Sequence, residues 1–172
     1  EYHGVKLNVE KWKTVIETVD VESEKLNKSL DFFIQSDNLF SKFRPRYTQM
    51  QMFGFEEGLN INWASNQQKL NICRAIDPGL ESVGDRELQK IKSKHPLIKT
   101  LIDFNKFKKL QSAFGKNFLE FVGLDGRIHP NIWQILSTGR ISVSEPNLNQ
   151  IPSKGDLAKV IRSCFIPEKN YK

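Results

Sequence analysis

Residues 9–34 read V-E-K-W-K-T-V-I-E-T-V-D-V-E-S-E-K-L-N-K-S-L-D-F-F-I, and they set the architecture of this chain. Apolar side chains recur there every three or four residues, which is the spacing of one face of an α-helix. Ser23 occupies the single gap in this near-heptad stripe. The stretch therefore predicts a long amphipathic helix with its buried face built from Trp12, Ile16, Val19, Leu26, Leu30 and Phe33.

A second long helix is predicted to begin at Pro96, since proline is favoured in the first turn of a helix. Two long helices with facing apolar stripes can bury one another as an antiparallel hairpin. The stripe of the second helix consists of Leu97, Leu101, Phe104, Phe107, Leu110, Phe114, Phe118 and Phe121.

Shorter elements are predicted between these helices. Ser65 and Gln68 have the spacing of a capping box, and Pro78-Gly79 ends the helix that they begin. Asp85 is expected to cap another short helix, which ends before His95-Pro96. Residues 35–60 are polar and predict a loop with three aromatic anchors, namely Phe40, Phe43 and Tyr47.

The pattern changes after Phe121. Asp125-Gly126 is a turn dipeptide, and residues 127–136 predict a strand that Pro130 interrupts and places at a sheet edge. Residues 161–166 predict another short strand. The expected fold class is therefore mainly α with a small β part, an α+β arrangement around a long helical hairpin.

Composition excludes several classes of protein. A chain of 172 residues with 38% hydrophobic residues can bury a core, and 27% charged residues argue against a membrane protein. No run of eighteen apolar residues exists, so a soluble, intracellular and cytoplasmic protein without a membrane partner is expected. Two cysteines, Cys73 and Cys164, fit neither a disulfide framework nor a zinc site and predict buried thiols.

Positive charge is concentrated in one segment. Residues 86–116 contain nine Lys or Arg against two acids and net +7, whereas the whole chain nets +6. Such a concentration suits a phosphate backbone. It also suits an ordinary solvated lysine-rich face, and charge alone leaves both interpretations open.

Residues 138–152, T-G-R-I-S-V-S-E-P-N-L-N-Q-I-P, form the most informative polar stretch. Gly139, Pro146 and Pro152 predict loops and turns, and the serine, asparagine and glutamine side chains can donate and accept hydrogen bonds. By composition the stretch could be a long polar connection. Its order carries more information than its composition.

That order resembles T-G-R-[LIF]-S-x-S-[ED]-P-N-L-x-x-I-P, the motif that opens the palm of family A DNA polymerases, the bacterial DNA polymerase I type. Residues 126–129 with Gln134 are similar to the family's G-R-[IV]-H…Q, and residues 109–114 to K-L-x-S-T-Y. Residues 61–70, 4–8 and 161–165 are similar to F-N-x-x-S-x-x-Q-L, G-V-x-[LI]-D and I-R-x-x-F. The motifs follow family order over about residues 4–167.

The resemblance has departures. The family usually has Gln-Asn where this chain has Asn149-Gln150, so the roles of the two side chains can be exchanged. Val143 replaces a usual serine, and the spacing from Gln134 to Arg140 is one residue shorter. Residues 42–60 lengthen a connection beyond the usual family form.

The resemblance implies two regions: a helical thumb over residues 1–122, with its long loop at about 35–60, and the N-terminal edge of a palm over residues 123–172. It implies that the partner is primer-template DNA and that the remaining palm and fingers of a polymerase are further partners. Arg140 is expected to approach the primer end from the minor groove, and Lys109 to contact phosphate. The full set of expected DNA-binding residues is Lys109, Ser112, Thr138, Arg140, Ser142, Ser144, Asn147, Asn149 and Gln150.

Nucleotide addition in this family uses Mg²⁺ held by clustered aspartates. In the family the first of them lies shortly after I-R-x-x-F. Here the only acidic residue after Phe165 is Glu168, which is too early and of the wrong type, so this chain is expected to bind no cofactor and to be inactive alone. Two D-x-E stretches, at residues 20–22 and 85–87, lack the strand and further acids of an exonuclease site. The alternatives are a non-catalytic duplex-binding accessory module and a helical-hairpin module that binds another protein.

Overall fold

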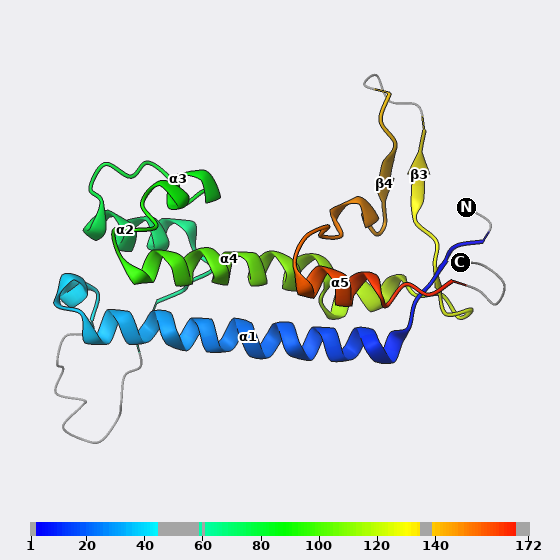
Figure 1. Ribbon diagram of the computed structural model, residues 1–172, viewed down its shortest axis with the longest axis horizontal. Coiled ribbons are helices and arrows are strands. Elements are labelled where there is room, and N and C mark those ends of the chain that lie inside the picture. The colour runs from blue at the N-terminus through cyan, green and yellow to red at the C-terminus, as the bar shows by residue number, and fades with distance from the viewer. Residues whose placement is uncertain (1–2, 45–58, 60, 135–138, 168–172) are drawn as a thin grey trace. The chain divides into compact units, whose positions relative to one another are not determined.

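The computed structural model describes residues 3–44, 59, 61–134 and 139–167 (Figure 1). In chain order, its strands are β1 (Val5–Lys6), β2 (Arg127–Ile128), β3 (Asn131–Trp133) and β4 (Ser142–Ser144). The α-helices are α1 (Val9–Ser36), α2 (Asn66–Ile76), α3 (Asp85–Lys90), α4 (Pro96–Phe114) and α5 (Asp156–Arg162). Short 3-10 helices cover Asn38–Phe43 (η1), Lys116–Phe121 (η3) and Leu148–Gln150 (η4). The predicted fold class, mainly α with a small β part, is confirmed.

The chain divides into two compact units. Unit 1 contains Glu1–Asp20 and Lys109–Lys172, and unit 2 contains Val21–Lys108. The two long helices, α1 and α4, each contribute one segment to each unit. Across the described ranges, no helix is long and apolar enough to cross a membrane.

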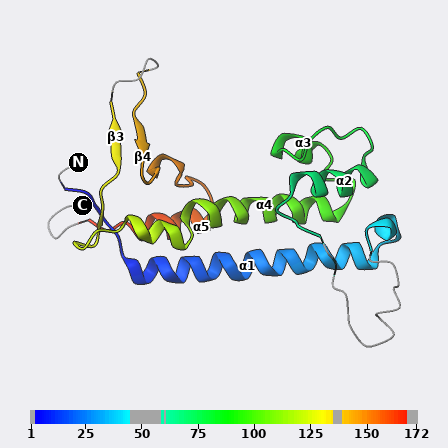
Figure 2. The ribbon, with the colours of Figure 1, turned by 180° about the vertical axis from the view of Figure 1, so that it is seen from behind.

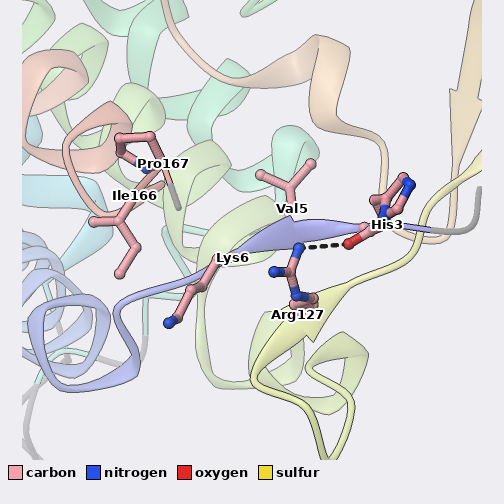
Figure 3. Close-up of a pocket in the computed structure, with 7 residues that line it drawn as sticks. His3, Val5, Lys6, Arg127, Ile166 and Pro167 are labelled. Atoms are coloured by element: carbon pink, nitrogen blue, oxygen red, sulfur yellow. Dashed lines mark hydrogen bonds between the residues drawn. The ribbon is translucent and has the colours of Figure 1, made fainter. Parts of the chain in front are cut away.

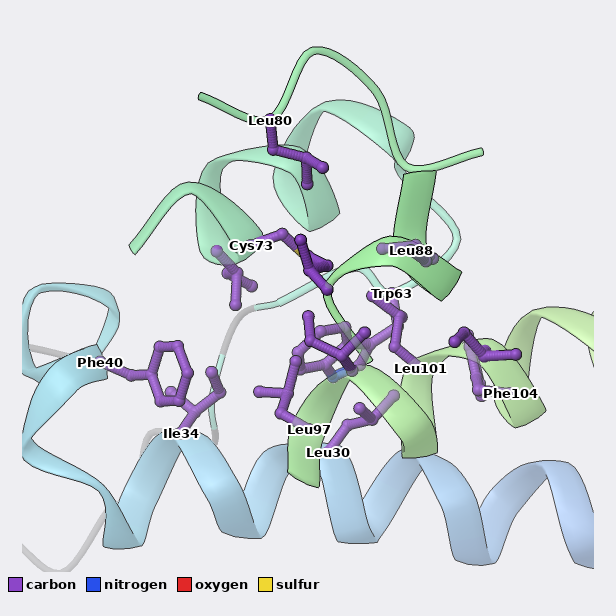
Figure 4. Packing of buried hydrophobic residues seen from close by; sticks show 14 residues of the cluster. Leu30, Ile34, Phe40, Trp63, Cys73, Leu80, Leu88, Leu97, Leu101 and Phe104 are labelled. Atoms are coloured by element: carbon purple, nitrogen blue, oxygen red, sulfur yellow. The ribbon is translucent and has the colours of Figure 1, made fainter. Parts of the chain in front are cut away.

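Unit 2 is built around a single apolar cluster (Figure 4). The predicted stripes meet there, because Leu30 of α1 and Leu97 and Leu101 of α4 are fully buried in the same cluster. Each such side chain contributes about 1.5–3 kcal/mol when it leaves water. The shorter elements close the cluster with Phe40, Trp63, Ile72, Cys73, Leu80, Leu88 and Ile91.

A polar group fastens the end of α1 to the start of α4 within unit 2. The backbone N–H of Leu97 donates to His95 Nδ1 over 3.1 Å, so the other ring nitrogen carries a proton and donates to Asp37 Oδ2 over 2.9 Å. Asp37 Oδ1 in turn accepts from the backbone N–H of Leu39 and caps η1. The hydrogen bond from Leu39, followed by that from His95, lowers the pKa of Asp37 below its ordinary value.

Unit 1 is built around Trp12, which is fully buried. Its ring stacks on Phe118 at a centroid distance of 4.4 Å and meets Phe114 and Phe165 edge-on at 6.1 and 5.7 Å. The start of α1, the end of α4, η3 and the C-terminal segment therefore share one aromatic core. Gln111 adds a polar contact between the helices, since its Nε2 donates to Asp20 Oδ1 over 2.6 Å.

The N-terminal strand joins distant parts of unit 1. β1 pairs antiparallel with β2, with Val5 opposite Ile128. On its other side, the backbone N–H of Ile166 donates to the Lys6 oxygen over 3.1 Å, and Leu7 forms a bridge with Phe165. Gly4 is required at the entry, because its φ is +57° and an added Cβ would lie 2.6 Å from His129 Cε1.

One prediction about the long helices is wrong. The second long helix ends at Phe114 instead of continuing to Phe121, because the chain turns at Gly115 into η3. An added Cβ at Gly115 would lie very close to the Gln111 oxygen, so this turn needs glycine. Phe118 nonetheless reaches the core, while Phe121 is exposed.

Predicted strands also differ from the observed ones. Residues 161–166 do not form a strand, because α5 runs through Arg162 and only Phe165 takes part in a bridge. The strand predicted over residues 127–136 divides at His129-Pro130 into β2 and β3, which pair with β1 and β4. Residues 135 and 136 lie outside the described part of the chain.

The predicted caps are only partly present. Ser65 caps α2 by accepting from the backbone N–H of Gln68, but the Gln68 side chain accepts from Asn62 instead of Ser65. Asp85 is the first residue of α3 rather than its cap, a place taken by Gly84 without a side-chain bond. In the predicted loop, Phe40 is buried and Phe43 half-buried, and Tyr47 lies outside the described residues.

Candidate nucleic-acid interface

Within the polar stretch, residues 139–152 comprise β4, which pairs with β3 in a two-stranded ribbon, and the segments directly before and after that strand (Figures 1 and 2). β3 and β4 are antiparallel, with Asn131 opposite Ser144, Ile132 opposite Val143 and Trp133 opposite Ser142. The stretch is therefore partly a strand, where the sequence predicted loops and turns. Alternating polar residues on β4 leave Ser142 and Ser144 on one face, both half-buried.

Arg140 lies two residues before β4, directly after Gly139 with its φ of +69°. Its side chain is exposed. Among the residues that the structure describes, the Arg140 guanidinium has no hydrogen-bond or ion-pair partner, so its five N–H donors face solvent. Thr138, the other predicted site residue before the strand, lies outside the described residues.

Two side-chain hydrogen bonds and a buried proline stabilise the turn after β4. Glu145 has a φ of +52°, and its Oε2 accepts from Asn131 Nδ2 on β3 over 2.8 Å. Pro146 is buried. The oxygen of the Asn147 side chain accepts from the backbone N–H of Asn149 over 3.1 Å and caps η4. The Asn147 amide nitrogen keeps its two donors, which are exposed.

Asn149 and Gln150 differ in what their side chains do. Asn149 Nδ2 donates to the backbone oxygen of Ile141 over 3.4 Å, which ties η4 to the residue next to Arg140. Gln150 is exposed, and none of the other described residues hydrogen-bonds to its side chain. The geometry thus gives a tethering role to Asn149 and leaves the Gln150 amide open to a ligand.

Lys109 and Ser112 lie elsewhere in unit 1, near the end of α4. Both are exposed, and because they are three residues apart they share one face of the helix. No hydrogen bond or ion pair between described residues joins them to the ribbon. The structure therefore brings together Arg140, Ser142, Ser144, Asn147, Asn149 and Gln150, and leaves Lys109 and Ser112 as a second group.

The basic segment is less free than its sequence predicts. Lys90 pairs with Glu87 at 2.7 Å, Lys94 with Asp77 at 2.6 Å, and Lys106 with Asp103 at 3.0 Å. The ammonium of Lys108 lies over the Phe104 ring. Part of the positive charge is therefore neutralised within the chain, and the sequence count overstates what can reach phosphates.

Two other features flank the N-terminal strand of unit 1. An open hollow of about 410 Å³ is lined by β1, Arg127 and the C-terminal segment, and Arg127 Nη1 donates to the His3 oxygen over 2.6 Å (Figure 3). His129 contacts Asp125 Oδ2 at 3.0 Å, and this hydrogen bond lowers the pKa of Asp125. The contact between His129 and Asp125 holds the turn between η3 and β2, and the bond from Arg127 joins β2 to the residue His3 before β1, which gives the G-R-I-H stretch a structural role.

Sequence reasoning assigned no role to Trp133, an exposed side chain of the ribbon. Trp133 is 66% exposed, whereas the other tryptophans, Trp12 and Trp63, are buried. The sequence did contain a signal. Asn131 is polar and Ile132 is apolar, so the alternation of a half-buried strand predicts a polar residue at the next position, where a tryptophan stands instead.

The described residues do not fit a metal ion. Within the described ranges, no group of three or more His, Cys, Asp or Glu side chains could hold one. Asp20 of the first D-x-E stretch is bonded to Gln111, and Glu87 of the second to Lys90. Burial raises the pKa of the Cys73 thiol to about 12 and also raises that of Cys164, so both cysteines are poor metal ligands.

Known proteins match this chain in sequence. The sequence model of DNA polymerase family A matches residues 59–172. A DNA polymerase I of a Synechocystis species is 37% identical over 86 residues, which cover 49% of this chain and 9% of that protein. A DNA polymerase I of Caldicellulosiruptor bescii is 32% identical over 105 residues, covering 60% of this chain and 12% of that protein. The chain spans about a tenth of the length of these relatives.

A solved structure matches the fold over nearly the whole chain. It is the POL domain of Pol1 from M. smegmatis in complex with DNA primer-template and dNTP. The TM-score is 0.70 at 21% sequence identity, and the match covers 98% of this chain and 28% of that one. The fold of this chain therefore resembles that of part of that domain.

Proposed function

This chain belongs to DNA polymerase family A, and on this basis we propose that it is the part of a DNA-directed DNA polymerase that grips the primer-template duplex. The observation that carries the proposal is the pairing of an open Arg140 guanidinium with the η4 turn, which Asn149 ties to the neighbouring Ile141. Donors from the segment before β4 and from the turn after it thereby lie at the two ends of one strand.

The chemistry of the minor groove explains why donors are needed there. Purine N3 and pyrimidine O2 are acceptors in every correct base pair, so donors aimed at them test pair geometry without reading sequence. Arg140 has only donors to offer, and Asn147 and Gln150 keep their amide N–H groups exposed. A mispair displaces these acceptors, so the same contacts sense an error at the primer end.

The second group supplies the contact to the backbone. Lys109 places a full positive charge beside the Ser112 hydroxyl on one face of α4, which suits a phosphate oxygen. In this proposal residues 1–122 act as the thumb and residues 123–172 as the first edge of the palm. Primer-template DNA is the partner, together with the remaining palm and fingers of the polymerase.

In this proposal Mg²⁺ belongs to the complete polymerase, where it would activate the attacking hydroxyl and stabilise the leaving oxygen. No step is assigned to a metal on this chain, because its described residues do not fit one. The chain alone is proposed to bind DNA without adding nucleotides. Nucleotide incorporation on primed template by the purified chain would contradict this part of the proposal.

Salt dependence of duplex binding tests the proposed phosphate contact. The chain is titrated with a fluorescent primer-template duplex between 50 and 200 mM salt, and log Kd is plotted against log salt concentration. Lys109→Ala should weaken binding to all sequences alike and reduce the slope by about one, since about 0.9 counterions are released per phosphate contact. Lys13→Ala, which removes an exposed lysine paired with Glu10, serves as the control. A full slope in Lys109→Ala would refute the contact.

A further inference from the structure

Trp133 shares one face of the β3–β4 ribbon with residues of the candidate interface. Directly opposed residues of an antiparallel pair lie on the same face, and side chains alternate along each strand. Because Trp133 is opposite Ser142 and Asn131 is opposite Ser144, these four side chains project from one face. Ile132 and Val143 project from the other.

The surroundings of Trp133 are polar and open. Its side chain is 66% exposed, and an open hollow of about 400 Å³ is lined by Asn131, Ile132, Trp133 and Gln134. Within the part of the chain that the structure describes, the indole makes no contact with another aromatic ring. A large aromatic side chain that stays in water forgoes the free energy of burial, so a ligand that covers it would gain this energy.

The chemistry of the face favours a base over a protein partner. The centre of a protein–protein interface gathers several apolar or aromatic side chains and excludes polar ones. Here a single indole stands among an asparagine and two serines, close in sequence to the cationic Arg140. Single-stranded nucleic acid is bound by this combination, an aromatic platform for a base and nearby donors and positive charge for the backbone.

We propose that Trp133 stacks on an unpaired base of the single strand that adjoins the bound duplex. Within a duplex, neighbouring pairs cover both faces of each base, so an indole can stack only where a base is unpaired or terminal. This inference rests on the proposed binding of the primer-template duplex, called the duplex grip below. It adds a second ligand, an unpaired nucleotide at the junction between the duplex and the single strand. Arg140 holds the paired end, and Trp133 holds the strand that continues past it.

The test compares two DNA ligands that differ only in the unpaired strand. One is a blunt duplex, and the other is the same duplex with a template overhang of several nucleotides. Stacking contributes about 1–3 kcal/mol per base by alanine substitution, and at this exposed site we expect about fivefold from the lower end of that range. Trp133→Ala should therefore weaken binding of the overhang ligand about fivefold and leave the blunt duplex unchanged, while Trp133→Phe keeps most of the affinity.

Intrinsic fluorescence gives an independent readout. Trp133 is the one exposed tryptophan of the three, and all three are described. The overhang ligand should quench emission of the unaltered chain, and the quenching should disappear in Trp133→Phe, whose remaining Trp12 and Trp63 are buried. Phe32→Ala, which removes an aromatic side chain that is 63% exposed on α1, is the matched control and should bind as the unaltered chain does.

Each outcome decides between the two proposals. Equal weakening of both ligands by Trp133→Ala, or no weakening of either, overturns the stacking role while the duplex grip stands if Lys109→Ala still lowers the salt slope. Overhang binding that depends on Trp133 without any affinity for blunt duplex supports stacking and refutes the grip. If neither DNA binds, and Trp133 emission changes only with the rest of the polymerase, the ribbon face is a protein contact and both proposals fail.

Discussion

The side-chain amide of Asn149 donates to the backbone oxygen of Ile141 across 3.4 Å, and this bond joins η4 to the segment that presents Arg140. Asn149 thereby uses its donor inside the chain. The neighbouring Gln150 keeps its amide exposed. Since the usual family order of these two residues is Gln-Asn, an exchange of their roles in DNA binding stays a prediction for this chain.

This exchange predicts an order of effects on duplex affinity. Gln150→Ala should remove a direct contact and weaken binding about five- to tenfold, as expected for a hydrogen bond of about 1–1.5 kcal/mol. Asn149→Ala should weaken binding less, because it only loosens a long hydrogen bond at an exposed site. Fluorescence anisotropy with one primer-template duplex measures both variants, and Ser153→Ala, an exposed residue just past the turn, is the control. A larger loss in Asn149→Ala would reverse the assignment.

The stability of unit 1 is predicted to depend on Trp12. Trp12→Ala should lower the free energy of unfolding by about 3–5 kcal/mol, because it removes a fully buried ring that contacts three phenylalanines. Trp12→Phe should cost less. Among the described residues, the buried Trp12 Nε1 has no hydrogen-bond partner, and this substitution removes that unsatisfied donor.

Urea unfolding followed by circular dichroism measures both effects. Phe32→Ala, at an exposed position of α1, should change the free energy of unfolding by less than about 0.5 kcal/mol. An effect of Trp12→Ala as small as that of the Phe32 control would show that the aromatic core does not hold the start of α1 in place.

A fall in pH should weaken the hydrogen bonds of Asp37 that join the end of α1 to the start of α4. The pKa of Asp37 is lowered by its hydrogen bonds from Leu39 and His95, so its carboxylate stabilises the folded chain fully above the ordinary pKa of about 3.8. This stabilisation is lost as the pH falls through the lower, folded-state pKa. Asp37→Asn keeps an oxygen for the Leu39 cap but removes the charge.

The difference in unfolding free energy between the unaltered chain and Asp37→Asn should therefore shrink as the pH is lowered from 5 to 3. Urea unfolding at half-unit pH steps supplies the values. A difference that stays constant over this range would mean that the carboxylate gains nothing from its two partners.

Helical periodicity was sufficient to predict α1 and the start of α4, because their stripes are long and bury a common core. Leu30 and Leu101 were both predicted to be buried, and both are. The short elements were harder, since tertiary contacts decide them. Residues 161–166 have a strand-like composition, yet α5 extends to Arg162, and only Phe165 lies beside Leu7.

The DNA-binding role of the candidate site stays a prediction, and its geometry could not be derived from the sequence. The order of polar residues around Arg140 is the basis of that prediction, whereas the ribbon register that places Trp133 opposite Ser142 needed the structure. The pairing of Lys94 with Asp77 was also hidden, because the partners are seventeen residues apart in the sequence. Charge counted along a segment therefore overestimated the free charge on it.

The central claim, that Arg140 donates to a minor-groove acceptor at the primer end, is tested by a double-mutant cycle with modified DNA. Replacing the terminal guanine by 3-deazaguanine removes the N3 acceptor, and 7-deazaguanine, which lacks a major-groove acceptor, is the matched control. Arg140→Ala and 3-deazaguanine should each weaken binding, and together they should cost little more than either alone, with a coupling of about 1 kcal/mol or more. Additive losses, or an equal coupling with 7-deazaguanine, would contradict the account.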